Sequence, residues 1–180
     1  MAHLRLADRQ DIPALSQLID RSARALCIND YDPEVVAGAL KGHFGVDTTL
    51  IDDGTYVVIE EEGALVACGG WSRRATMFGG DAYAKRDPVL LVPPHDPARI
   101  RAFFVAPEFA RRGFGRQILE YCEGAAQAEG FVKCTLMATL TGIPFYEKCG
   151  FVALGAEFFP LADGGEIEFR PMIKELSLSS

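Results

Sequence analysis

The stretch "FFVAPEFARRGFGRQIL", from Phe103 to Leu119, decides the fold of this chain. Its apolar start continues the run "RIRAFFV", which is dense enough in apolar residues to predict a central, buried strand. From Phe114 onward, apolar residues recur at helical spacing, and a helix is expected to end at Gly130. Between the strand and the helix stand two adjacent arginines and two spaced glycines, Arg111, Arg112, Gly113 and Gly115.

A glycine-rich turn before a helix is typical of an anion-binding site. The free N–H groups of the first helical turn point outward, and the helix dipole adds positive potential there. Glycine lets the backbone approach a ligand closely, and Arg111, Arg112 and Arg116 add charge. The stretch therefore predicts a phosphate or pyrophosphate ligand, with a turn that serves only the fold as the alternative.

The spacing fits neither of two common nucleotide-binding motifs. A Walker loop requires a lysine directly after its last glycine, and no lysine follows either glycine here. A Rossmann fingerprint requires a third glycine, and that position is Ile118.

The composition indicates one globular domain. The chain has 180 residues, of which 49% are hydrophobic, enough for a substantial core. A net charge of −7 argues against nucleic acid or an anionic membrane as a partner. The five cysteines lie in apolar runs without C-x-x-C spacing, which predicts reduced thiols in a cytoplasmic protein. No secretory leader, membrane span or metal-ligand cluster is expected from the pattern.

Hydrophobic periodicity predicts a mixed sheet flanked by helices, in the order β-α-α-β-β-β-α-β-α-β-β. A capping aspartate, Asp8 or Asp11, is expected before the first helix, and Asp32 before the second. The last two strands are expected to form a hairpin. Strands are predicted at 3–7, 56–59, 65–71, 99–105, 132–139, 151–159 and 165–176, and helices at 12–23, 32–44, 114–130 and 142–149.

Two motifs resemble those of a known family. "VAPEFARRGFGRQIL" resembles the coenzyme A-binding motif of the GNAT superfamily of acetyl-CoA-dependent N-acetyltransferases, [RQ]-x-x-G-x-[GA] after a strand. "PFYEKCGF" resembles the family's F-Y-x-x-x-G-F signature. The order of the motifs and of the elements fits the family over roughly residues 3–176. Ala110 replaces the arginine or glutamine of the motif, and Thr139 stands where many members carry an asparagine.

The resemblance implies an α/β protein with the GNAT-like acyl-CoA N-acyltransferase fold, a mostly antiparallel sheet flanked by helices. It implies one N-acetyltransferase domain over residues 1–180. The implied reaction is direct attack of a primary amine, of a small molecule or a protein, on the thioester of acetyl-CoA, without a metal. A non-catalytic acyl-CoA-binding sensor is the alternative, and a homodimer through the terminal hairpin is possible.

The resemblance also implies roles for individual residues. Tyr146 matches the family tyrosine that protonates the departing thiolate, the alternative being aromatic packing. A main-chain N–H of the strand ending at Val105 is expected to stabilise the thioester oxygen. The sequence names no general base. The implied cofactor-binding residues are Phe103 and Val105 through their main chain, Thr139 beside the pantetheine arm, and Arg111, Arg112, Gly113, Phe114, Gly115 and Arg116 at the pyrophosphate.

The segment from Ser72 to Ala98 is longer than an ordinary connection and rich in proline and glycine. It is expected to border the acceptor site, the alternative being a passive insertion. An arginine pair, Arg73 and Arg74, is predicted either to hold an acceptor carboxylate or to be exposed without a partner. Asp81, Asp87 and Asp96 of the segment are expected to face the acceptor and attract a cationic amine. His95 is expected on the same side, the alternative being a solvated side chain, and it is not assigned as a base.

Overall fold

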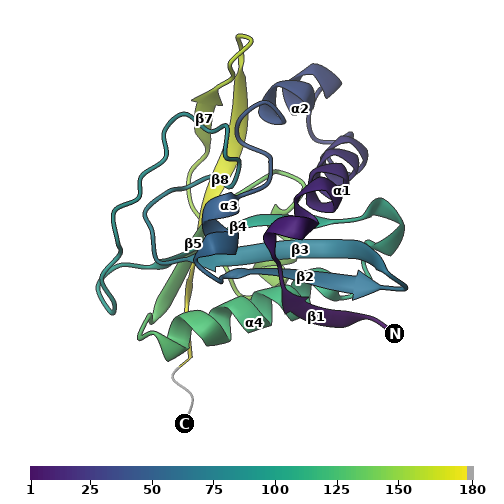
Figure 1. Cartoon of the computed structure of the whole chain (residues 1–180). Coiled ribbons are helices and arrows are strands. Elements are labelled where there is room, and N and C mark those ends of the chain that lie inside the picture. Colours follow the sequence, from purple (N-terminus) through teal and green to yellow (C-terminus); the bar gives the residue numbers. More distant parts are fainter. Residues whose placement is uncertain (178–180) are drawn as a thin grey trace.

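The computed structural model of the chain describes residues 1–177 and shows a curved sheet with helices on both faces (Figure 1). The strands are β1 (His3–Leu6), β2 (Tyr56–Glu61), β3 (Ala64–Ser72), β4 (Ala98–Val105), β5 (Lys133–Ala138), β6 (Val152–Ala153), β7 (Glu157–Pro160) and β8 (Glu166–Glu175). The helices are α1 (Ile12–Leu26), α2 (Pro33–Ala39), α3 (Thr48–Asp52), α4 (Phe114–Ala128) and α5 (Ile143–Lys148). Two 3-10 turns lie at Arg9–Asp11 and Pro107–Phe109.

The sheet runs in the order β1-β2-β3-β4-β5-β8-β6, and β7 pairs with β8 beside this path. Every strand pair is antiparallel except β4–β5. The predicted fold class, a mostly antiparallel mixed sheet flanked by helices, is therefore confirmed, with β4 in a central position.

Local sequence signals account for several boundaries. Glu62 and Gly63, at the turn of the β2–β3 hairpin, both have positive φ angles, 53° and 78°, as tight hairpin turns require. Before α1, the Asp8 carboxylate accepts the N–H of Gln10, and the Asp11 carboxylate accepts the N–H of Asp8. This reciprocal capping confirms the predicted start of the first helical segment.

The second predicted helix is shorter than expected, because tertiary contact overrides the local pattern. α2 ends at Ala39 instead of continuing to Phe44, and the unpredicted α3 follows. The segment after α2 packs tightly against the later chain: a Cβ at Gly80 would lie 2.0 Å from the carbonyl oxygen of Gly42. In the same segment, the side chains of His43 and Phe44 are both buried.

The predicted strand over 151–159 is in fact two strands, β6 and β7, which both pair with β8. The break lies opposite Pro171, whose carbonyl accepts the N–H of Leu154. Proline has no N–H with which to return a second hydrogen bond, so regular pairing stops there.

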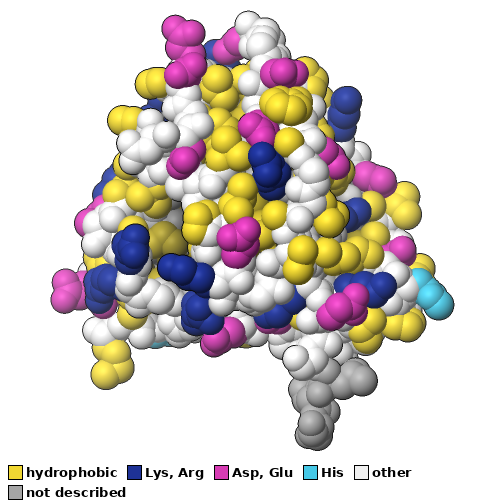
Figure 2. All heavy atoms as spheres, turned by 180° about the vertical axis from the view of Figure 1, so that it is seen from behind, with side chains coloured by type: hydrophobic (Ala, Val, Ile, Leu, Met, Phe, Trp, Pro, Cys, Tyr) yellow, Lys and Arg dark blue, Asp and Glu magenta, His cyan; other side chains and the backbone are white. Residues whose placement is uncertain are grey.

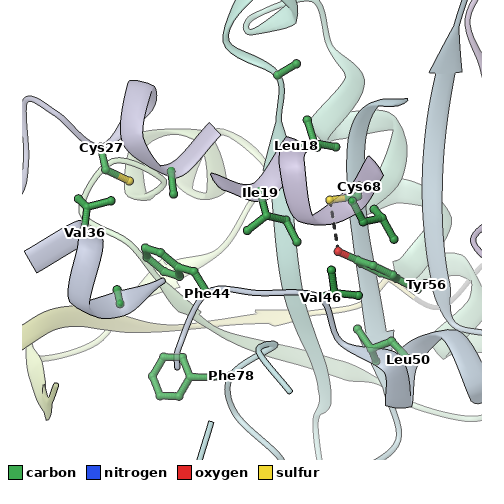
Figure 3. Close-up of a cluster of buried hydrophobic side chains, with 14 of the residues drawn as sticks. Leu18, Ile19, Cys27, Val36, Phe44, Val46, Leu50, Tyr56, Cys68 and Phe78 are labelled. Atoms are coloured by element: carbon green, nitrogen blue, oxygen red, sulfur yellow. Dashed lines mark hydrogen bonds between the residues drawn. The ribbon is translucent and has the colours of Figure 1, made fainter. Parts of the chain in front are cut away.

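The two faces of the sheet carry separate cores. On the α1 side, the core includes Leu18, Ile19, Phe44, Leu50, Tyr56 and Phe78 (Figure 3). On the α4 side, it includes Trp71, Ile100, Ile118, Leu119, Tyr146 and Phe151. Within the described part of the chain, no helix is both long and apolar enough to cross a membrane.

Candidate active site

The centre of the sheet opens where β4 leaves β5. These two strands pair only at Ala98–Cys134 and Arg99–Thr135, although β4 continues to Val105. Beyond Arg99, one edge of β4 is therefore free of its parallel neighbour.

β4 also has a bulge, just beyond the last residue that pairs with β5. Ala102 has a φ of 60°, and the register between β3 and β4 shifts at this point. Such a conformation is uncommon for a residue with a Cβ, and a bulge bends the strand that carries it. The buried hydroxyl of Tyr56 supports the bulge, lying 3.1 Å from the carbonyl oxygen of Ala102. The bulge at Ala102, supported by Tyr56, thus accompanies the separation of β4 from β5.

A cavity of about 720 Å³ occupies this opening. Its walls come from both cores, so it connects the two faces of the sheet. On the α4 side it is lined by Phe103, Val105, Phe114, Leu136 and Tyr146, and on the α1 side by Phe44, Phe78, Phe104, Met137 and Phe169.

The first turn of α4 lies at one mouth of the cavity. Gly113 begins the helix with a φ of 87°, and no side chain caps it. Apart from the adjoining backbone, a Cβ built on Gly113 has no described atom within 4 Å, whereas one on Gly115 would lie 3.3 Å from the Phe145 ring. The first N–H groups of α4 are therefore open to a ligand, as an anion site requires.

Positive charge surrounds this mouth. The cavity lining includes Arg111, Arg116 and Lys148, and none of them has an ion-pair partner within residues 1–177. Figure 2 shows Lys and Arg side chains gathered beside a hollow in this face of the molecule. The arrangement can hold a phosphate or diphosphate.

Most of the cofactor-binding candidates come together here, but Arg112 does not. The lining contains Phe103, Val105, Arg111, Gly113, Phe114, Gly115, Arg116 and Thr139. The guanidinium of Arg112 pairs with Glu61 at 2.9 Å and lies over the rings of Phe109 and Phe114. The predicted contact of the Arg112 side chain with a ligand is therefore not supported, because its charge is neutralised at the β2–β3 turn.

Tyr146 lies inside the cavity, on α5. It is 9% exposed, and its ring packs against Phe103, Phe145 and Phe151. Burial raises the pKa of its phenol well above the ordinary value, so the hydroxyl keeps its proton at neutral pH. The hydroxyl of Thr139, also in the lining, accepts the N–H of Gly142 at 3.0 Å, which helps to form the turn before α5.

The α1 side of the cavity includes residues that sequence reasoning left unassigned. His43 lies in the lining and is 7% exposed, with its ring 4.8 Å from that of Phe78 and 5.8 Å from that of Phe169. Burial lowers its pKa, which favours the neutral imidazole. No local signal marks this histidine, because only the folding of the segment after α2 brings it to the cavity.

The long segment contributes Met77, Phe78 and Gly79 to the same wall. The charged residues of this segment that were predicted to contact the acceptor do not line the cavity. Arg73 pairs with Glu129 and Arg74 with Asp53, so neither is unpartnered, and neither lines the cavity. The carboxylates of Asp81, Asp87 and Asp96 accept N–H groups of Thr48, Val89 and Val92, and these residues and His95 also lie outside the lining. The prediction that these aspartates would face the acceptor is not supported, because their carboxylates accept main-chain N–H groups instead.

The fold is that of one class of enzyme, the acetyltransferases. A family model described as "Acetyltransferase (GNAT) domain" matches residues 52–153, more than half of the chain. The chain therefore belongs to the GNAT acetyltransferase family. No sequence among the curated proteins matches it significantly.

Solved structures share the fold over nearly the whole chain. A GCN5-related N-acetyltransferase from Rhodopseudomonas palustris has a TM-score of 0.72 at 18% identity, over 98% of this chain and 96% of its own. The PaiA N-acetyltransferase from Thermoplasma acidophilum, solved in complex with coenzyme A, has a TM-score of 0.66 at 14% identity, over 97% and 99%. Ard1 from Thermoplasma volcanium has a TM-score of 0.61 at 16% identity, over 98% and 99%.

Proposed function

We propose that the protein transfers the acetyl group of acetyl-CoA to a primary amine. The observation that carries this proposal is a single cavity that joins the uncapped first turn of α4 to the opening between β4 and β5. A diphosphate suits the N–H groups and arginines at the first of these places. An extended pantetheine arm suits the free edge of β4, where it can pair with the main chain as an added strand. The coenzyme A complex of the Thermoplasma acidophilum relative supports this choice of ligand.

The diphosphate contacts in this proposal come from Arg111, Gly113, Gly115 and Arg116. Phe103 and Val105 supply main-chain hydrogen bonds to the pantetheine arm, and Thr139 lies beside it. Arg112 contributes indirectly, because its guanidinium lies over the ring of Phe114 at the helix start.

The amine attacks the thioester carbonyl directly, so a C–N bond forms and the C–S bond breaks. A main-chain N–H of β4 near Val105 stabilises the negative charge that develops on the carbonyl oxygen. Tyr146 donates its proton to the departing thiolate, which leaves as the free thiol of coenzyme A, and the proton that the amine nitrogen loses on becoming an amide restores the phenol. Because its pKa is raised, Tyr146 is protonated before the reaction, and the phenolate formed by the transfer is basic enough to regain a proton.

Two measurements test the proposal. Calorimetry should show binding of coenzyme A, and a thiol reagent should detect coenzyme A release from acetyl-CoA only when an amine is added. Mass spectrometry should identify the acetylated amine. Binding without turnover across a broad amine panel would favour the sensor alternative instead, and absence of binding would overturn both functions.

A further inference from the structure

The α1 side of the cavity has a chemistry different from that of the α4 mouth. Its wall consists mainly of apolar and aromatic side chains from four parts of the chain: Ala23 and Leu26 of α1, Phe44, Met77 and Phe78, and Phe104, Met137 and Phe169 of the sheet. Of the residues that the structure describes, no aspartate or glutamate lines the cavity at any point. The wall itself therefore offers no carboxylate to a ligand bound in the cavity.

The charge behind this wall is positive. Arg101 lines the cavity and is 5% exposed, with its Nη1 donating to the carbonyl oxygen of Thr76 at 2.7 Å. Its Nε forms an ion pair with Oδ2 of Asp47 at 3.1 Å without hydrogen-bond geometry, while Oδ1 of Asp47 accepts from Arg86 at 2.9 Å. One buried carboxylate thus lies beside two guanidinium groups, and neither Nε nor Nη2 of Arg101 has a hydrogen-bond partner among residues 1–177. The cluster keeps an excess of positive charge, since burial lowers the pKa of Arg101 only to about 10.

The imidazole of His43, also on the α1 side, provides no counter-charge for a bound ammonium group. His43 is uncharged when deprotonated, and its nearest ring neighbours are aromatic: Phe78, Tyr83, Phe159 and Phe169. A second ammonium group on the acceptor would therefore be buried without a counter-charge and close to the excess positive charge around Arg101. Both effects oppose its binding.

We propose that the acceptor is an apolar monoamine, a primary amine on an aromatic or branched aliphatic body without a second positive charge. This inference rests on the proposed acetyl transfer, because it names the acceptor of the same site. The apolar wall buries the body of such an amine. The lack of a carboxylate disfavours the ammonium form, so the cavity selects the neutral amine that can attack the thioester.

A panel of matched amines provides the test. 2-Phenylethylamine and isopentylamine represent the proposed class, while 1,5-diaminopentane, spermidine and a lysine peptide carry further charge. With acetyl-CoA held at saturation, kcat/KM for the apolar monoamines should exceed that for the diamine by about 100-fold or more, since an unpaired buried charge is strongly disfavoured. Equal or better use of the diamine, spermidine or the peptide would overturn this inference while leaving acetyl transfer intact. Release of coenzyme A with no amine at all would contradict the proposed function itself.

A charge placed in the wall should change this preference. Met77→Glu introduces a carboxylate on the α1 side, and Val89→Glu makes the same kind of change in the same segment at a side chain that is 64% exposed. Met77→Glu should raise the ratio of diamine to 2-phenylethylamine kcat/KM at least about tenfold, and Val89→Glu should leave it unchanged. Coenzyme A affinity, measured by calorimetry, verifies that each variant is folded. An unchanged ratio in a folded Met77→Glu variant would contradict the proposed position of the acceptor, and the amine panel of the wild-type protein remains decisive if that variant does not fold.

Discussion

The ring of Tyr146 meets the ring of Phe103 edge-on, with 6.3 Å between their centroids. Phe103 belongs to β4 and Tyr146 to α5, so the contact spans the cavity where β4 has already left β5. This relationship places a buried phenol opposite the strand edge along which we propose that the thioester arm lies.

Removing only the hydroxyl of this phenol tests its proposed role. Tyr146→Phe should lower kcat by roughly 10²–10⁴-fold, the usual contribution of general acid–base catalysis. Coenzyme A affinity should remain within about twofold, because the ring and its packing are retained. Tyr121→Phe makes the same change at an exposed position on α4 and should have no effect. Equal kcat in the Tyr146→Phe variant would assign Tyr146 to packing alone.

The glycines at the start of α4 should be required for coenzyme A binding. Gly113→Val places a branched side chain at a φ of 87°, a conformation that disfavours any residue with a Cβ and so disturbs the start of the helix. Gly115→Val forces Phe145 to move. Either change should weaken coenzyme A binding at least about 100-fold by calorimetry. Gly124→Val, on the exposed face of the same helix, is the matched control, and unchanged affinity in a folded Gly113→Val variant would refute the proposed diphosphate site.

Removing the negative charge from the buried cluster of Asp47, Arg86 and Arg101 should strongly lower the stability of the protein. Asp47 is fully buried and is the carboxylate partner of both Arg86 and Arg101. Asp47→Asn keeps a side-chain oxygen that can cap α3 but removes the negative charge, so the free energy of unfolding should fall by about 3–5 kcal/mol. Urea denaturation measures this change.

An exposed ion pair offers the matched control. Asp52 pairs with Arg9 at the surface, where their side chains are 51% and 65% exposed. Asp52→Asn should lower the free energy of unfolding by less than about 1 kcal/mol. Similar losses for the two variants would mean that the buried cluster is not a special contributor to stability.

His43 predicts a dependence of stability on pH. Its pKa is lowered in the folded protein, whereas the unfolded chain has the ordinary value near 6.5. As the pH falls below about 6.5, the unfolded chain binds a proton that the folded protein does not, so the free energy of unfolding decreases. The slope reaches up to about 1.4 kcal/mol per pH unit until the folded pKa is reached.

Comparison with His43→Phe isolates this effect, because phenylalanine suits the surrounding rings and does not titrate. The difference in stability between wild type and His43→Phe should shift in favour of the variant as the pH is lowered from 7 to 5. A wild-type curve parallel to that of His43→Phe would rule out a depressed pKa at His43.

Local sequence determined the central part of this protein. The apolar run to Val105, the glycines at 113 and 115, and the helical spacing after Phe114 specify strand, turn and helix from neighbouring residues alone. Glycine tolerates positive φ, and the hydrophobic period selects which face is buried, so neither depends on distant parts of the chain. For this reason the fold class, the GNAT resemblance and the position of the helix start could be read from the sequence.

Only the tertiary structure decided which residues line the cavity and which of them have charged partners. The separation of β4 from β5, the pairing of Arg112 with Glu61 and the position of His43 all depend on contacts between residues far apart in the sequence. A charged residue looks equally available in a sequence whether the folded chain neutralises it or leaves it open. Asp81 and Arg74 looked like acceptor contacts, yet their charged groups bond to the N–H of Thr48 and to Asp53. Local pattern fixes backbone conformation, whereas the electrostatics of a site depend on which distant partners the fold brings within hydrogen-bonding distance.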